Sequence, residues 1–148
     1  MDALVDRSPV SARPLRVLVI DDDQSVSAAI QAILSRRNGQ TDVANRAHAG
    51  IHALTASRHD VVLIDLFMPG LSGLDTITYI RRGSTIPIVA MSGFRLRHSA
   101  GSDERRDFFQ MAMERGASSW LRKPFSPQEL LSAIDHGLSL SSLEKHKQ

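Results

Sequence analysis

One short stretch, residues 61–65 with the sequence Val-Val-Leu-Ile-Asp, constrains the fold more than any other part of the chain. Its four apolar residues precede a single acid, and the turn residues Pro69 and Gly70 follow almost at once. A short apolar run bounded by turn residues is typical of a strand buried on both faces of a sheet. An acid at the carboxyl end of such a strand lies where open α/β sheets bind ligands, which makes Asp65 a candidate site residue. An aspartate there is also a common loop cap, and this stretch alone favours neither interpretation.

The rest of the chain repeats an alternation of strand and helix patterns. Apolar runs predict strands at 15–20, 41–44, 61–65, 86–91 and 118–122. Helical spacing of apolar residues predicts helices near 25–38, 46–57, 72–82, 103–115 and from 127 onward. Such an alternation predicts an α/β fold with a doubly wound, five-stranded parallel sheet. We expect a flexible leader at 1–14, one domain at 15–140 and a C-terminal tail at 141–148.

Composition excludes several classes of protein. The 148-residue chain has no cysteine, which excludes disulfides and thiolate metal sites. Its 18 basic and 16 acidic residues are nearly balanced, so charge gives no reason to expect direct binding to nucleic acid. No apolar run has the length of a membrane span, and the N-terminus is unlike a signal peptide. We therefore expect a cytoplasmic protein with no membrane contact.

Polar residues follow four of the predicted strands, and parallel strands bring their carboxyl ends to one edge of a sheet. They are Asp21, Asp22, Asp65, Ser92 and Lys123. Carboxylates gathered at one edge repel one another, and Mg²⁺ neutralises them while it also reaches a phosphate. Lys123 and Ser92 supply a positive charge and a hydroxyl donor suited to phosphoryl oxygens. One carboxylate then remains to attack phosphorus, which predicts an aspartyl phosphate.

The motifs that carry these residues resemble the receiver domain of bacterial two-component response regulators. They are Val-Leu-Val-Ile-Asp-Asp-Asp at 17–23, Leu-Ile-Asp-Leu-Phe-Met-Pro-Gly at 63–70, Met-Ser-Gly at 91–93 and Leu-Arg-Lys-Pro-Phe at 121–125. Any one motif is weak, but all four in order at strand ends are specific. The resemblance covers about residues 15–140 and implies a flavodoxin-like fold with strand order 2-1-3-4-5.

The resemblance also implies a role for each site residue. Asp65 would accept a phosphoryl group from a histidine kinase or a histidine phosphotransfer protein. Asp22, Asp65 and the backbone carbonyl of Phe67 would bind Mg²⁺ directly, and Asp21 would bind it through a water. Ser92 and Lys123 would hold the phosphoryl oxygens, and the bond between Lys123 and Pro124 would be cis. The chain would catalyse only its own phosphorylation and dephosphorylation and would not be an enzyme in the ordinary sense.

Trp120 departs from the pattern of the family, which usually has Tyr or Phe at this position. In the family this aromatic turns inward when the hydroxyl corresponding to Ser92 moves toward the phosphoryl group. Tryptophan is bulkier and its N–H requires a partner. An inward switch, an outward interface anchor and plain packing all remain open for Trp120.

Phe67 and Phe94 flank the family's route for hydrolytic water. Two apolar rings there predict a shielded, long-lived phosphoryl group, whereas ordinary core packing of either ring is the alternative. The polar segment 93–107 is longer than the family normally needs, and either a partner-binding loop or a solvated insertion would account for it.

Two rival functions are weighed against the receiver. The spacing of Asp21, Asp23 and Ser25 resembles the opening motif of the haloacid-dehalogenase phosphatases, with Asp21 as nucleophile and Asp23 as acid–base. That interpretation leaves Asp65 without a function and finds no later acidic pair to hold the metal. The second rival is a receiver-like binding module that ignores phosphate, which the intact set of site residues disfavours.

The predicted helix that starts at 127 is followed by too few residues for an output domain, so we expect a stand-alone receiver. It would relay phosphate or bind a downstream protein through 103–115, 118–122 and the helix from 127. A homodimer through the same surface is compatible with the resemblance.

Overall fold

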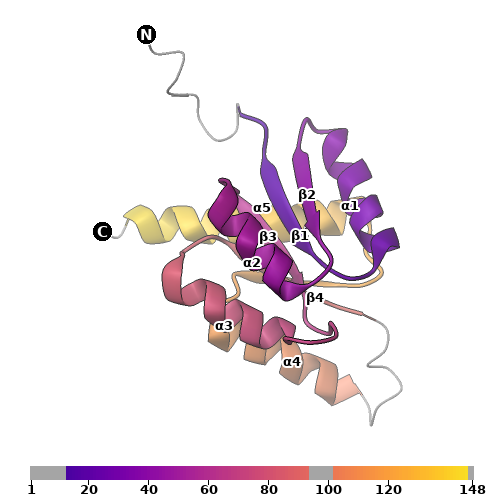
Figure 1. The fold of residues 1–148 in the computed structure, drawn as a ribbon, viewed down its shortest axis with the longest axis vertical. Coiled ribbons are helices and arrows are strands. Elements are labelled where there is room, and N and C mark those ends of the chain that lie inside the picture. Colours follow the sequence, from indigo (N-terminus) through magenta and orange to yellow (C-terminus); the bar gives the residue numbers. More distant parts are fainter. Residues whose placement is uncertain (1–12, 94–101, 147–148) are drawn as a thin grey trace.

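The computed structural model describes residues 13–93 and 102–146. The strands are β1 (Arg16–Ile20), β2 (Gln40–Ala44), β3 (Val61–Asp65), β4 (Ile88–Ser92) and β5 (Ser119–Arg122). The helices are α1 (Gln24–Ser35), α2 (Ala47–Ala56), α3 (Gly73–Gly83), α4 (Ser102–Arg115) and α5 (Pro127–His146) (Figure 1). Strand and helix alternate along the described chain, as the sequence predicts.

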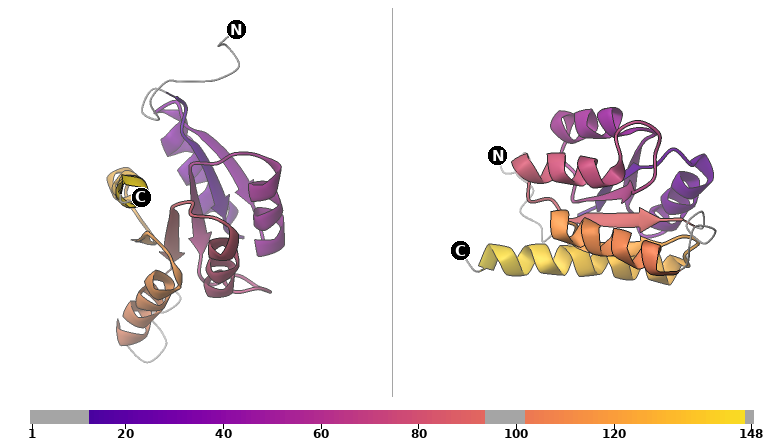
Figure 2. Two further views of the ribbon diagram at one scale, coloured as in Figure 1. Left: turned by 90° about the vertical axis from the view of Figure 1, so that its left-hand side faces the viewer. Right: turned by 90° about the horizontal axis from the view of Figure 1, so that it is seen from below.

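The strands form one parallel sheet in the order β2-β1-β3-β4-β5, which confirms the predicted doubly wound, flavodoxin-like fold. Helices α1 and α5 cover one face, and α2, α3 and α4 cover the other (Figure 2). This three-layer arrangement places the carboxyl ends of the strands along one edge, where the predicted site residues follow them.

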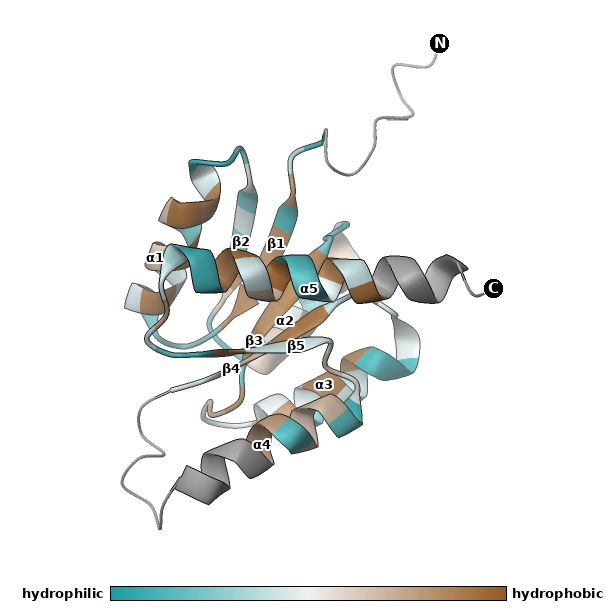
Figure 3. Cartoon of the chain, turned by 180° about the vertical axis from the view of Figure 1, so that it is seen from behind, coloured by the Kyte–Doolittle hydropathy of each residue, from teal (hydrophilic) through white to brown (hydrophobic). Residues whose placement is uncertain are grey.

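Each central strand contributes side chains to both layers of the core. Leu18 and Ile64 pack in the cluster beneath α2, α3 and α4, whereas Val19 and Leu63 pack in the cluster beneath α1 and α5. All four side chains are fully buried. Viewed from the α5 side, hydrophobic strands lie behind a helix on which apolar and polar residues alternate (Figure 3). The continuous apolar run at 61–65 is therefore explained by burial on both faces.

Two glycines allow helices to approach the sheet closely. A Cβ atom at Gly50 of α2 would overlap the Ile20 side chain, and a Cβ atom at Gly73 would overlap the Asp65 carbonyl oxygen and Leu66 Cα. The second contact is with backbone atoms, which cannot rotate away. Helix α3 therefore begins directly against the end of β3, and Gly73 helps to fix the position of Asp65.

Some boundaries differ from the prediction. β4 begins at Ile88 rather than at 86, because Pro87 has no N–H to donate to a neighbouring strand, although its carbonyl accepts from Val62 N–H at 3.0 Å. Helix α5 continues to His146, beyond the domain end predicted at 140. The predicted leader lies outside the described residues except for positions 13 and 14. Within the described ranges, none of the helices combines the length and the hydropathy needed to cross a membrane.

Candidate functional site

Two buried aspartates meet at the carboxyl ends of the central strands. β1 and β3 pair in parallel with Ile20 opposite Ile64, so Asp21 and Asp65, the next residues, lie side by side. Asp21 N–H donates to the carbonyl of Ala44 at 3.0 Å, which fixes the start of the loop. Asp21 is 1% exposed and Asp65 5% exposed. Sheet pairing alone thus brings together two acids that are far apart in the sequence.

Asp22 completes a cluster of three carboxylates. One oxygen from each of Asp21, Asp22 and Asp65 lies within 4.8 Å of the other two. Hard divalent cations such as Mg²⁺ prefer carboxylate oxygen ligands at this kind of spacing. The donor set is therefore suited to such an ion, as the sequence predicts.

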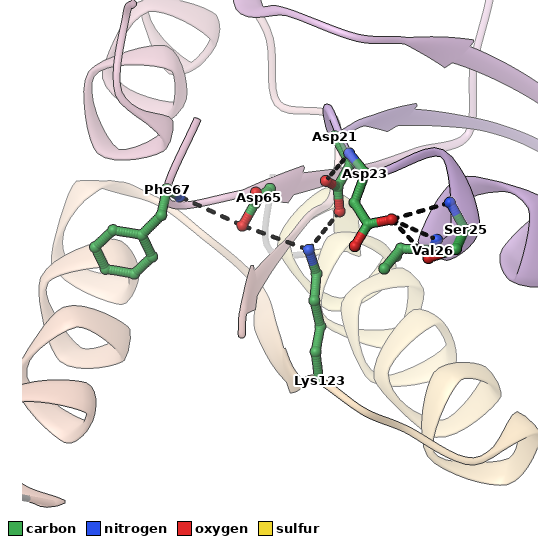
Figure 4. A network of polar contacts seen from close by, with 7 residues as sticks. All are labelled: Asp21, Asp23, Ser25, Val26, Asp65, Phe67 and Lys123. Atoms are coloured by element: carbon green, nitrogen blue, oxygen red, sulfur yellow. Dashed lines mark hydrogen bonds and ion pairs between the residues drawn. The ribbon is translucent and has the colours of Figure 1, made fainter. Parts of the chain in front are cut away.

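Lys123 is the cation that faces this cluster. Its Nζ donates to Asp21 Oδ2 at 2.5 Å and lies 3.6 Å from Asp65 Oδ1 (Figure 4). The backbone N–H of Lys123 donates to the Ser92 carbonyl at 2.8 Å, which continues the pairing of β4 with β5. The peptide bond between Lys123 and Pro124 is cis, as the resemblance implies. β5 thus delivers one ammonium group to acids that follow β1 and β3.

The electrostatics of Asp65 differ from those of a surface carboxylate. Burial raises the pKa of Asp65 from 3.8 to about 6, and the negative charges of Asp21 and Asp22 raise it as well. Lys123 and the Phe67 N–H, which donates to Asp65 Oδ1 at 3.3 Å, lower the pKa and offset part of this rise. The site therefore has more negative charge than its own lysine neutralises, and an added cation would favour the ionised form.

Asp23 has a structural role at the start of α1. Its Oδ1 accepts hydrogen bonds from Ser25 N–H at 2.9 Å, Ser25 Oγ at 2.6 Å and Val26 N–H at 3.4 Å. The bond from the Ser25 hydroxyl is the main reason that the pKa of Asp23 is lowered. A general acid needs a raised pKa rather than a lowered one. The geometry therefore disfavours the phosphatase interpretation, in which Asp23 is the acid–base.

Ser92, the last residue of β4, lies on the neighbouring strand. In the pairing of β3 with β4, Asp65 lies opposite Met91. Ser92 is therefore one residue further toward the carboxyl end of β4 than the partner of Asp65. Its side chain is fully buried, and its Oγ has no hydrogen-bond partner among the described residues. A buried hydroxyl normally has such a partner. The position is consistent with a donor to a phosphoryl oxygen.

The ring of Phe67 lies elsewhere than the shielding hypothesis predicts. The Phe67 ring points away from the Asp65 carboxylate (Figure 4), and it packs edge-to-face on Phe108 of α4 with ring centroids 4.7 Å apart. In this structure it therefore does not cover the acceptor oxygens. Phe94, the other predicted shield, lies outside the described residues. No sequence pattern pairs Phe67 with Phe108, so this contact was not predicted.

Trp120 lies at the surface rather than inside the domain. It is 52% exposed, and its ring is tilted against Phe109 of α4 with a centroid distance of 5.9 Å. β5 is an edge strand whose residues alternate between buried and exposed, and Trp120 occupies an exposed position. The indole therefore lies on the outside of the domain in this structure, and its roles as a switch or as an interface anchor stay predictions.

Comparisons with known proteins agree with this geometry. Residues 17–135 match the family model "Response regulator receiver domain". DNA-binding response regulator MtrA of Mycobacterium tuberculosis is 30% identical over 119 residues, which are 80% of this chain and 48% of that protein. Transcriptional regulatory protein DltR of Streptococcus agalactiae is 30% identical over 135 residues, 90% of this chain and 56% of that protein. The chain thus spans about half the length of these curated relatives.

Solved structures give the same result. A response regulator receiver domain protein from Clostridium thermocellum has a TM-score of 0.73 and 26% identity, with 87% of this chain and 98% of that chain covered. Chemotaxis response regulator CheY4 of Vibrio cholerae has a TM-score of 0.72 and 25% identity, with 85% and 100% covered. Together with the fold and the acidic edge, these matches show that the chain belongs to the response regulator receiver domain family.

Proposed function

We propose that this chain accepts a phosphoryl group on Asp65 from the phosphohistidine of a histidine kinase or phosphotransfer protein. The observation that carries the proposal is the meeting of three carboxylates and Lys123 at the ends of β1, β3 and β5. Aspartate is a known nucleophile toward phosphorus, and Asp65 is the acid of the three that ends the central strand of the sheet.

The transfer uses groups already in place. A carboxylate oxygen of Asp65 attacks phosphorus, a P–O bond forms, and the P–N bond breaks. The imidazole leaves with the electron pair of that bond and takes a proton from solvent. With a pKa of about 6, Asp65 is mostly ionised at pH 7.5 and ready to attack. Ser92 Oγ and Lys123 Nζ donate to the phosphoryl oxygens, which orients the group in line with the acceptor.

Asp21, Asp22, Asp65 and the backbone carbonyl of Phe67 would hold Mg²⁺. When bound, the ion supplies positive charge that neutralises the phosphoryl oxygens. In this proposal the chain catalyses only its own phosphorylation and dephosphorylation.

The surface formed by α4, β5 and α5 is the proposed output of the switch. A groove of about 550 Å³ lies between β5 and α5, and Trp120, Arg122 and His136 are among its lining residues. An exposed tryptophan beside a groove is a typical anchor for a protein partner. We propose a downstream protein, a relay protein or a second copy as the occupant, in the cytoplasm and without direct contact to nucleic acid. The DNA-binding role in the name of MtrA belongs to that longer protein.

Intact mass spectrometry tests the proposal. The wild-type protein, Asp65→Ala and Asp135→Ala, which changes an exposed acid of α5, are each mixed with acetyl phosphate and Mg²⁺. Wild type and the Asp135 variant should gain one phosphoryl group, Asp65→Ala should gain none, and a chelator should suppress the gain.

The other outcomes separate the rival functions. Labelling that persists in Asp65→Ala and disappears in Asp21→Ala would favour phosphatase-type chemistry. Failure of the wild type to become labelled, both with acetyl phosphate and with a panel of phosphorylated histidine kinases, would favour a binding module that ignores phosphate.

A further inference from the structure

Helix α4 carries two adjacent phenylalanines that contact different parts of the molecule. Phe108 packs on Phe67 with centroids 4.7 Å apart and planes at 83°, and Phe109 packs on Trp120 with centroids 5.9 Å apart and planes at 34°. Both distances fall within the range of favourable aromatic pairs. Neighbouring residues of a helix point in different directions, so α4 bridges the loop after β3 and the exposed edge strand β5.

The backbone of Phe67 contacts Asp65, the proposed phosphoryl acceptor. Its backbone N–H donates to Asp65 Oδ1 at 3.3 Å, while its ring extends away from that carboxylate (Figure 4). A phosphoryl group on Asp65 changes the charge and the position of the oxygens that this N–H contacts. We expect the backbone of Phe67 to adjust to this change. Its half-buried ring lies against Phe108, so the adjustment would reach α4.

We propose that Phe67 and Phe108 are positioning residues that transmit phosphorylation of Asp65 to α4, and that Phe109 transmits the shift of α4 to Trp120. The inference rests on the proposed function. In this chain the signal would then pass from the loop after β3 to the surface formed by α4, β5 and α5. It would pass through contacts between aromatic rings that lie outside the sheet. Trp120 responds on this route while it remains on the surface, so the larger indole does not need space inside the domain.

Trp120 is the only tryptophan of the chain, so its fluorescence reports on this route directly. Emission and intact mass are measured on the same samples, before and after addition of acetyl phosphate and Mg²⁺. The wild type should show a shift in emission that follows the mass gain. Phe108→Leu keeps an apolar side chain but removes the ring, and should gain the same mass with loss of the emission shift. Phe108→Met gives a second variant with a different packing volume.

Met111→Leu is the matched control, since it changes an exposed residue of the same helix, and it should keep the emission shift. Thermal unfolding of each variant shows that the fold is intact. A full emission shift in both Phe108 variants would overturn the inference, as would a phosphorylated wild type whose Trp120 emission does not change. Absence of any mass gain in the wild type would instead count against the proposed function, and the inference would fall with it.

Discussion

Replacing Asp65 with asparagine should stabilise the metal-free protein at neutral pH. Burial is the main reason that the pKa of Asp65 rises from 3.8 to about 6 in the folded state. At 1.36 kcal/mol for each pKa unit, this rise corresponds to about 3 kcal/mol that folding loses once the carboxylate is ionised. Asparagine has the same shape, retains an oxygen that accepts from the Phe67 N–H, and has no charge to desolvate.

The pH dependence has a definite sign. Below about pH 4 the carboxyl is protonated in both the folded and the unfolded chain, and the cost is absent. Between about pH 4 and 6 the unfolded chain releases its proton first, so the free energy of unfolding of the wild type falls. Above that window both states are ionised and the cost stays constant. The advantage of Asp65→Asn over wild type should therefore grow by about 2.4 kcal/mol between pH 4 and 7, which is most of the total.

Urea denaturation in the presence of a chelator, at several pH values between 4 and 7.5, measures this difference. Asp135→Asn makes the same chemical change at an exposed position of α5 and serves as the matched control. Addition of Mg²⁺ at pH 7.5 should stabilise the wild type more than Asp65→Asn, since the ion needs the carboxylate. A free-energy difference between Asp65→Asn and wild type that stays the same from pH 4 to pH 7 would refute the reasoning.

Three other substitutions test separate parts of the structure. Gly73→Ala places a Cβ against the backbone at the end of β3. It should lower the free energy of unfolding, measured by urea denaturation, by about 1–3 kcal/mol. An unchanged free energy of unfolding would show that α3 does not pack directly on that backbone. Lys123→Met leaves buried Asp21 without its cation and should cost about 3–5 kcal/mol at pH 7.5. Most of that loss should be recovered when Asp21→Asn is added, and an additive double variant would contradict the pairing. Asp23→Ala removes the N-cap of α1 and should cost about 1 kcal/mol in thermal unfolding, while labelling by acetyl phosphate persists; loss of labelling would revive the phosphatase interpretation.

The fold and the polar edge of the sheet could be predicted because they depend on local patterns. The apolar run at 61–65 requires burial on both faces, and parallel pairing then brings Asp65 beside Asp21 whatever the loops do. The hydrogen bonds of Asp23 follow in the same way from its place before a helix, although its spacing from Asp21 was interpreted only as that of an acid–base.

The orientations of the aromatic rings could not be predicted, because they depend on which neighbours a helix presents. A ring at position 67 can cover Asp65 or turn toward α4, and the choice is made by Phe108, which lies far along the chain. Trp120 likewise depends on Phe109. Two consecutive phenylalanines in a predicted helix were the available signal, but spacing alone does not say which residue each one meets.

The short contact between Lys123 and Asp21 has a consequence for how ligands of the site influence one another. The Lys123 ammonium group lies against Asp21, the acid that follows β1, and the same group is the natural donor to a phosphoryl oxygen. To donate to a phosphoryl oxygen, Lys123 Nζ has to break its ion pair with Asp21. Breaking this pair costs less once another positive charge neutralises Asp21. Metal and phosphoryl binding would then be thermodynamically linked, and by reciprocity each would tighten the other to the same extent.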